Sequence, residues 1–274
     1  MESKYAIKNG ELIEKESASV SVYNKAMFFD FCVYGNIKIV KGKMFMPDSN
    51  AENLFHSAEV IGIEHKFRKN EVVSWARKII AKNNLKDALI RMLLIGQEKD
   101  EEPILFLFPV GLTFYPAKFY NYGVKVITFK GERFIPSSKS KNLLLGYIAY
   151  REAAKQDAID ALLVDNDGNI REGTRSSFFA IKDSHLIMPP AGKSLGGLTR
   201  EIIKKISPKM LKIREEDISL AKIEEYDGYF LTGSTMKIMP VRQIDDKILS
   251  PKAAEKIRKL QGLYEKYTSD KYVE

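Results

Sequence analysis

Residues 111–122, GLTFYPAKFYNY, interrupt an otherwise regular succession of short helical and strand-like segments, and this break constrains the fold most strongly. The stretch contains glycine, proline and several aromatic residues but no hydrophobic period. We interpret it as a connection between domains or as an active-site loop. The 274 residues suffice for two modest domains. The break predicts a small first domain at residues 1–115, an interdomain loop at 116–122 and a larger second domain at 123–274.

The hydrophobic pattern predicts mixed secondary structure on both sides of the break. Asn9-Gly10 is a strong hairpin signal. The strands are predicted at 5–8, 11–13, 32–40, 88–97, 103–110, 124–129, 160–165, 177–182, 186–188 and 228–232, and the helices at 50–61, 70–83, 141–156, 199–206 and 251–266. This order, without a phosphate loop or a dinucleotide glycine fingerprint, favours two α+β domains over a doubly wound sheet.

Composition and charge exclude several classes of protein. No run approaches the roughly 20 apolar residues of a membrane helix, and the N-terminus lacks an apolar signal core, so we expect a cytoplasmic protein with no membrane partner. Cys32 is the only cysteine, and the three histidines are dispersed, so neither a disulfide nor a metal site is expected. The net charge of +8 comes from lysines scattered among glutamates, which predicts a solvated surface rather than a nucleic-acid site.

The run SSKSKNLLLGYIAYREA, residues 137–153, places Lys139 in a serine-rich stretch directly before a predicted helix. A lysine at such a junction is usually only solvated. Three features further along the chain change this interpretation. Glu172 follows an Asp-Gly turn, GGLTR at 196–200 begins a helix with Thr199 as a candidate N-cap, and Ser234 and Thr235 follow a predicted strand.

Together these features supply what pyridoxal phosphate requires. A lysine amine can carry the cofactor covalently. A carboxylate beside the pyridine nitrogen keeps that nitrogen protonated, so that the ring accepts electrons. A helix start and hydroxyl-rich backbone turns favour a phosphate group. Taken singly, each feature is more simply a surface residue, a helix cap or a strand end.

With these features in this order, the sequence resembles the class IV aminotransferases, which include branched-chain aminotransferases, D-amino-acid aminotransferases and aminodeoxychorismate lyases. The resemblance covers about residues 28–248 and is strongest over 137–241. It implies an α+β, two-domain, fold-type IV enzyme with its active site between the domains, a homodimer, and pyridoxal phosphate as cofactor. The family's Schiff-base motif matches Lys139, Ser140, Asn142, Leu143, Leu144, Ala149, Glu152 and Ala153.

The resemblance also carries the family's cofactor-binding positions onto this chain. Lys139 is the implied catalytic residue, and Glu172 is the implied partner of the pyridine nitrogen. Leu195 falls beneath the ring, the first phosphate turn falls on Leu198 and Thr199, and the second falls on Ser234 and Thr235. The family's phosphate-binding arginine falls on Asn53, which is a departure, because a charge-assisted contact is stronger than a neutral one. Three interpretations stay open: a weaker amide contact from Asn53, replacement by His56, Arg175 or Arg200, or a degenerate site.

The substrate site is less strongly specified. The resemblance makes Tyr34 the active-site tyrosine, although Gly35 stands where the family has an acidic residue. Arg175 is unusual at its position and could bind a substrate carboxylate. Apolar side chains suited to an aliphatic substrate, or equally to a core, are Phe31, Tyr34, Phe108, Tyr115 and Met236.

The resemblance predicts transfer of an amino group between a branched-chain or broad aliphatic L-amino acid and a 2-oxo acid such as 2-oxoglutarate. A D-amino-acid aminotransferase is the second candidate and an aminodeoxychorismate lyase the third. A non-enzymatic descendant that only binds a ligand is the alternative outside enzymes.

Overall fold

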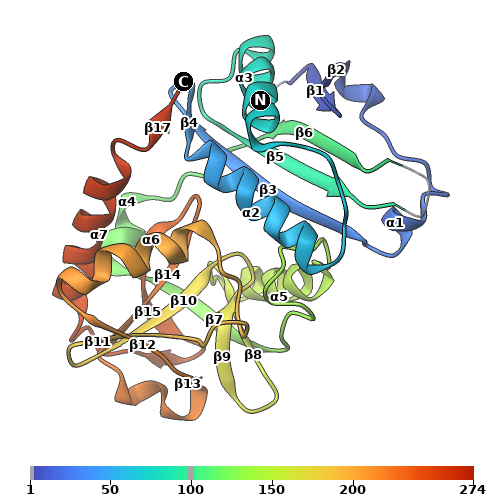
Figure 1. Ribbon diagram of the computed structural model, residues 1–274. Coiled ribbons are helices and arrows are strands. Elements are labelled where there is room, and N and C mark those ends of the chain that lie inside the picture. Colours follow the sequence, from blue (N-terminus) through green and yellow to red (C-terminus); the bar gives the residue numbers. More distant parts are fainter. Residues whose placement is uncertain (1–2, 98–101) are drawn as a thin grey trace. The chain divides into compact units, whose positions relative to one another are not determined.

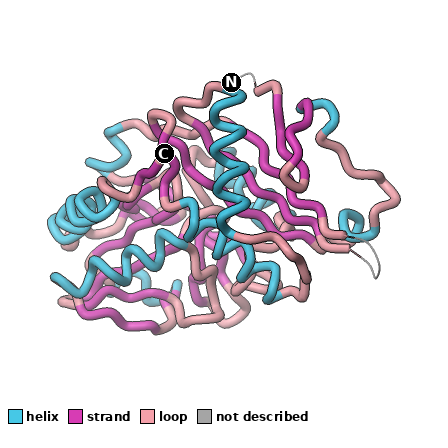
Figure 2. The backbone as a smooth tube through the Cα atoms, turned by 45° about the horizontal axis from the view of Figure 1, so that its top comes forward, coloured by secondary structure: helices cyan, strands magenta, loops and turns pink. Residues whose placement is uncertain are grey.

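The computed structural model describes residues 3–97 and 102–274, which contain both helices and strands (Figures 1 and 2). By their contacts these residues fall into two compact units. The first contains residues up to 113, together with 138–141 and 270–274; the second contains 114–137 and 142–269. The short segment that contains Lys139 therefore belongs to the first unit, although it lies between two parts of the second in the sequence.

The first unit is built on a seven-stranded antiparallel sheet, in the order β17-β4-β3-β5-β6-β1-β2. Its elements are β1 (Tyr5–Lys8), β2 (Glu11–Glu14), α1 (Lys25–Phe28), β3 (Cys32–Val40), β4 (Lys43–Phe45), α2 (Pro47–Val60), α3 (Lys69–Asn83), β5 (Ala88–Ile95), β6 (Ile104–Val110) and β17 (Tyr272–Val273). The predicted hairpin, strands and helices of this part are confirmed, with ends that differ by up to three residues.

Helices α2 and α3 lie over one face of this sheet (Figure 1). Alternate residues of β3, among them Val33, Ile37 and Ile39, are fully buried beneath them, as expected for a strand with one covered face. Leu54 of α2 packs into the same core. The core therefore fixes the rotation of α2 about its own axis, and with it the directions in which Asn53 and Ser57 point.

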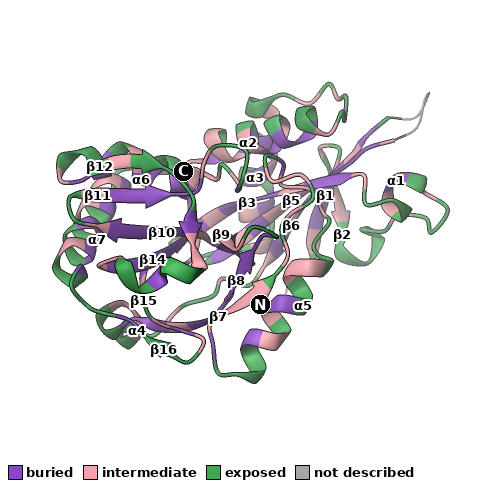
Figure 3. Ribbon diagram, turned by 90° about the horizontal axis from the view of Figure 1, so that it is seen from below, coloured by how far each residue is buried: buried purple, intermediate pink, exposed green. Residues whose placement is uncertain are grey.

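The second unit contains a ten-stranded mixed sheet, in the order β12-β11-β10-β14-β15-β7-β8-β9-β13, with β16 paired to β15. Its elements are α4 (Ala117–Tyr122), β7 (Val124–Lys130), α5 (Leu144–Lys155), β8 (Ala161–Val164), β9 (Asn169–Gly173), β10 (Ser177–Lys182), β11 (His185–Met188), α6 (Leu198–Ile206), β12 (Lys212–Glu215), β13 (Ile218–Ser219), β14 (Gly228–Gly233), β15 (Lys237–Ile244), β16 (Lys247–Ile248) and α7 (Ala254–Thr268). Strands β10, β11 and β14 are almost wholly buried (Figure 3).

Two predictions in this part are wrong, and one is refined. The interruption at 111–122 contains the helix α4, whose apolar residues Phe119 and Tyr120 pack against the core and replace the missing period with contacts. Glu172 follows strand β8 and the Asp-Gly turn as predicted, and it lies inside a further strand, β9, which was not predicted. Helix α6 begins at Leu198 with Gly197 as its N-cap, so Thr199 is its second residue and not the cap.

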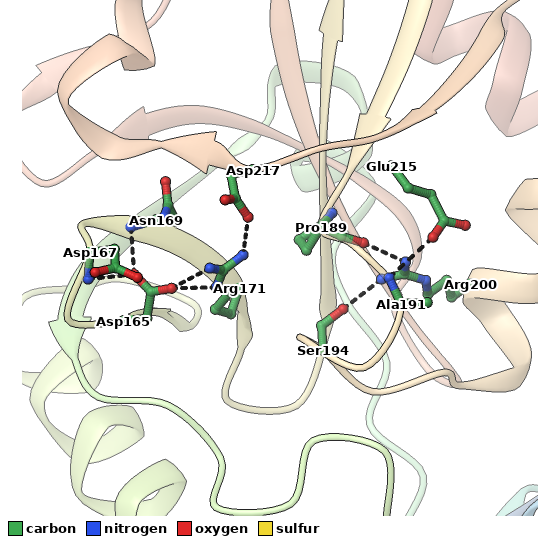
Figure 4. Close-up of polar contacts among 10 residues, drawn as sticks. All are labelled: Asp165, Asp167, Asn169, Arg171, Pro189, Ala191, Ser194, Arg200, Glu215 and Asp217. Atoms are coloured by element: carbon green, nitrogen blue, oxygen red, sulfur yellow. Dashed lines mark hydrogen bonds and ion pairs between the residues drawn. The ribbon is translucent and has the colours of Figure 1, made fainter.

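A buried ion-pair network fixes the turn before β9 (Figure 4). The guanidinium of Arg171 donates to Asp165 Oδ2 over 2.6 Å from Nε and also pairs with Asp217. Arg171 is 3% exposed and Asp165 5% exposed at their side chains. The backbone N–H groups of Asp167 and Asn169 donate to Asp165 Oδ1, at 3.0 and 2.8 Å. Neighbouring residues of a strand point to opposite faces, so this network leaves Glu172 directed to the other face.

The stability of the first unit is predicted to fall in acid because of His65. Its ring contacts the tilted ring of Phe55 and stacks on that of Phe67, with ring centroids 4.3 and 5.7 Å away. Burial lowers the pKa of His65 below its ordinary value of 6.5. The unfolded chain therefore binds a proton at His65 more readily than the folded chain does. The contribution of the neutral His65 to the free energy of unfolding is fully present above pH 6.5 and is lost as the pH drops below it. Denaturant titrations at several pH values should show this loss in the wild type and a smaller loss in His65→Phe; equal losses would contradict it.

Candidate active site

Lys139 is held by backbone pairing with the beginning of β3. The Tyr34 N–H donates to the Lys139 carbonyl over 3.0 Å, and the Lys141 N–H donates to the Cys32 carbonyl over 2.8 Å. Between them, Val33 and Ser140 form an isolated antiparallel bridge. The lysine backbone is thus as fixed as a residue in a sheet, although residues 138–141 form no strand of their own.

Helix α2 holds the same segment from its side. Ser138 Oγ donates to the Ser57 carbonyl over 2.9 Å, and the Lys139 N–H donates to Ser57 Oγ over 3.2 Å. Ser57 Oγ in turn donates to the Asn53 carbonyl over 2.8 Å, one helical turn earlier. Asn53 therefore shares a helix face with the serine that touches Lys139. Ser57 was not among the predicted site residues, and its i, i+4 spacing from Asn53 was the signal that could have found it.

Tyr34 lies beside the amine that the sequence singles out. Lys139 Nζ stands 5.2 Å from the centre of the Tyr34 ring. Both residues are half-buried. The structure of the first unit thus brings together Lys139, Tyr34 and the helix face of Asn53, three of the predicted site residues.

The departure at Gly35 has a steric reason. A Cβ built on Gly35 would lie 2.8 Å from Met92 Cε and 3.7 Å from Leu54 Cβ. The space that an acidic side chain would need is therefore filled by the methyl group of Met92. Gly35 is paired with Met92 of the neighbouring strand β5.

In the second unit, Glu172 is a buried carboxylate with two partners. Its Oε1 lies 2.9 Å from Arg133 Nε, and the side chains are 4% and 12% exposed. Burial raises the pKa of Glu172, whereas the charge of Arg133 and a hydrogen bond from the Leu195 backbone lower it. Leu195, predicted to lie beneath the cofactor ring, thus contacts the predicted ring partner Glu172. Arg133 was not found from the sequence, since it lies 39 residues from Glu172 along the chain.

The turn after Glu172 is organised by the buried carboxylate of Asp160. Thr174 donates to Asp160 Oδ1 through its N–H at 3.1 Å and its Oγ1 at 2.5 Å, and Ser176 Oγ donates to Oδ2 at 2.8 Å. A Cβ at Gly173 would lie 2.2 Å from Ser176 Oγ, so this position requires glycine. The turn holds Arg175 at its exposed tip, between the two anchored hydroxyl residues.

Arg175 lies among aromatic rings and hydroxyl groups. Its guanidinium carbon stands 4.1 Å from the centre of the Tyr150 ring. Burial raises the pKa of Tyr115, while the charge of Arg175 and a hydrogen bond with Thr235 oppose that rise. Arg175 is therefore near Thr235, a predicted phosphate ligand. The guanidinium and the hydroxyl groups of Tyr115 and Thr235 together make a site that suits a carboxylate or phosphate anion.

Two backbone features of the second unit fit a phosphate group. The N-cap Gly197 offers no side chain to the first turn of α6, and a Cβ built on Gly196 or Gly197 would meet no atom within 4 Å. The helix start therefore has open space beside N–H groups that favour an anion. Thr232 Oγ1, at the end of β14, is buried and has no hydrogen-bond partner among the described residues. The half-buried Ser234 and Thr235 follow after Gly233, in the turn to β15.

Two of the proposed replacements for the missing arginine are already engaged. Arg200 donates to Ser194 Oγ and to the Pro189 carbonyl, both over 2.6 Å, and so fixes the loop before α6 (Figure 4). His56 is 63% exposed and lies 3.8 Å from Glu59. Leu198 is half-buried at the start of α6, and Met236 packs in the hydrophobic core, so its contact with substrate stays a prediction.

Within residues 3–97 and 102–274, no cluster of histidine, cysteine or carboxylate side chains is suited to a metal ion. Nor does any helix in these ranges have the length and apolar character needed to cross a membrane.

Known proteins are similar to this chain over nearly its whole length. The family model of class IV amino-transferases matches residues 33–244. A Rickettsia typhi protein named "Probable branched-chain-amino-acid aminotransferase" is 30% identical over 255 residues, 88% of each chain. A Staphylococcus epidermidis D-alanine aminotransferase is 27% identical, covering 94% of this chain and 96% of its own. The crystal structure of the Escherichia coli branched-chain amino acid aminotransferase matches with a TM-score of 0.87 at 22% identity, covering 100% and 99% of the two chains.

With the family match covering more than half of its length, the chain belongs to the class IV aminotransferases. It has the fold of the fold-type IV enzymes, and the predicted α+β class is confirmed. It is a transaminase, and its cofactor is pyridoxal phosphate. The buried Glu172 carboxylate, the orphaned Thr232 hydroxyl and the open start of α6 fit that cofactor.

Proposed function

We propose that this transaminase moves the amino group of a branched-chain or broad aliphatic L-amino acid to a 2-oxo acid such as 2-oxoglutarate, with Lys139 as its catalytic residue. The observation that carries the proposal is the placement of Lys139. Its backbone is fixed on one side by Tyr34 and on the other by Ser57, within a segment that matches the family's cofactor-lysine motif. The names of the relatives favour the same substrates and also keep D-amino acids as the second candidate.

The proposed roles of the remaining residues follow from their chemistry. Pyridoxal phosphate, when bound, supplies an electron sink for the substrate carbon that loses its proton. Lys139 Nζ moves that proton as a general base and later as an acid. Glu172 would accept a hydrogen bond from the protonated pyridine nitrogen, and Leu195 would pack under the ring. In the second unit, the turns of Leu198, Thr199, Ser234 and Thr235 would hold the phosphate. In the first unit, the amide of Asn53 stands at the position of the family's phosphate-binding arginine and would take that role.

A half-reaction screen tests the proposed substrate class. The cofactor-loaded enzyme is mixed with single L- and D-amino acids, without a 2-oxo acid, and the cofactor absorbance is followed. Leucine, isoleucine and valine in the L-form should convert the cofactor faster than D-alanine does. Conversion by D-amino acids alone would replace this proposal by the D-amino-acid aminotransferase. A second arm, with 2-oxoglutarate added to the converted enzyme, should restore the original absorbance.

Arg175 is proposed to bind a substrate carboxylate. Arg175→Gln should raise the KM of both substrates by about 10- to 100-fold, since a hydrogen bond to a charged group contributes roughly 1.5–3 kcal/mol. Arg151→Gln is the matched control, because Arg151 also lies over a tyrosine ring of α5, that of Tyr147, and it should leave both KM values unchanged. A loss of cofactor affinity at unchanged KM would instead make Arg175 a phosphate ligand.

We also propose a cytoplasmic homodimer. The exposed apolar residues Leu144, Tyr147 and Ile148 form a stripe on α5 at helical spacing, which is suited to a protein contact. Sedimentation equilibrium should give twice the mass of the chain, and a monomer at micromolar concentration would contradict the dimer.

A further inference from the structure

Arg133 forms a buried ion pair with Glu172, the predicted ring partner. It lies in the segment that follows β7, whereas Glu172 lies in β9. Besides its ion pair with Glu172, Arg133 directs Nη2 toward the Thr174 carbonyl over 3.5 Å. Arg133 thus connects Glu172 to the turn that carries Arg175.

The two charges of this pair depend on one another. A carboxylate that is 4% exposed loses most of its hydration, and an uncompensated one takes up a proton instead of staying charged. Burial still raises the pKa of Glu172 above its ordinary value, but the Arg133 charge and the Leu195 N–H oppose that rise and favour the charged form. An ionised carboxylate has about four lone-pair sites, so these two contacts leave room for a further donor.

The chemistry of the pyridine nitrogen makes this compensation matter. A neutral carboxylic acid would donate a hydrogen bond to an unprotonated ring nitrogen and keep its proton, whereas a carboxylate accepts a hydrogen bond from a protonated one. Only the second arrangement makes the ring a strong electron sink. The charge state of Glu172 therefore decides the electronic state of a bound ring.

We propose that Arg133 is a positioning residue that keeps the buried Glu172 carboxylate ionised and oriented, so that a bound cofactor ring stays protonated at its nitrogen. The inference rests on the proposed role of Glu172. Arg133 itself contacts neither substrate nor cofactor in this proposal. Its side chain acts only through Glu172.

Nitrogen NMR of pyridoxal phosphate labelled at the ring nitrogen tests the proposal on the loaded enzyme. The ring nitrogen should be protonated in the wild type and in Arg133→Lys, and unprotonated in Arg133→Met. The dissociation constant for the cofactor should rise at least about tenfold in Arg133→Met, as expected for loss of a charge-assisted hydrogen bond. Arg133→Gln occupies similar space and replaces the methionine variant if that one does not fold. A protonated ring with unchanged affinity in the folded, uncharged variant would overturn the proposal.

A second measurement needs no cofactor and so separates this inference from the proposed function. In the cofactor-free Arg133→Met protein, Glu172 should be a buried acid whose pKa lies well above that in the unfolded chain. The free energy of unfolding of the Arg133→Met protein should then decline as the pH rises. The double variant Arg133→Met/Glu172→Gln should lack that decline. Equal pH dependence in the two variants would overturn the inference, whereas a wild-type protein that binds no cofactor would contradict the proposed function alone.

Discussion

Lys139→Ala is expected to reduce transamination by more than about a thousandfold and to abolish covalent attachment of the cofactor. The amine is proposed both to carry the cofactor and to transfer the proton, and general acid–base catalysis alone contributes about 10²- to 10⁴-fold. The structure places the amine beside Tyr34 and fixes its backbone from β3 and from α2.

The measurement is steady-state turnover together with the absorbance of the purified protein. Lys141→Ala is the matched control, since Lys141 lies two residues along the same segment and pairs with Asp30 over 2.8 Å. It should retain turnover within a few-fold. Normal transamination by Lys139→Ala would remove the assignment of the catalytic residue.

Arg171→Met is expected to lower the free energy of unfolding of the protein by about 3–5 kcal/mol. Removing one partner of a buried ion pair leaves the other charge uncompensated, which costs about that much. Here the uncompensated group is Asp165, which stays buried beneath the turn before β9, whereas Asp217 is 52% exposed and can be hydrated.

Denaturant titration of the purified protein measures this effect. Arg214→Met, on the exposed strand β12, removes the same charge and should change the free energy of unfolding by less than about 0.5 kcal/mol. A loss below about 1 kcal/mol for Arg171→Met would show that the network contributes little, as is typical of exposed pairs.

The regular elements of the fold could be predicted because their signals are local. Asn9-Gly10 marked the first hairpin, and the alternation from Cys32 to Val40 marked β3. Helix α4 could not be predicted in the same way. Its six residues carry no hydrophobic period, and it is stabilised by tertiary contacts of Phe119 and Tyr120.

The candidate site likewise contains residues that could be predicted from the sequence and residues that could not. Lys139 and Glu172 could be proposed because each stands in a local motif of known chemistry. Arg133 and Ser57 could not, because their importance arises from contacts between residues far apart in the chain: Arg133 with Glu172, and Ser57 with Lys139. Asp160 was missed for the same reason, since it organises the turn at Thr174 and Ser176 from its place directly before β8.

The central claim, that Lys139 carries pyridoxal phosphate, is tested most directly by borohydride reduction of the loaded enzyme. The protein is reduced, digested and mapped by mass spectrometry. The account predicts one peptide, containing Lys139, that bears the reduced cofactor, and no modified peptide after prior incubation with an amino acid substrate. A modified peptide without Lys139, or a protein that takes up no cofactor, would contradict it.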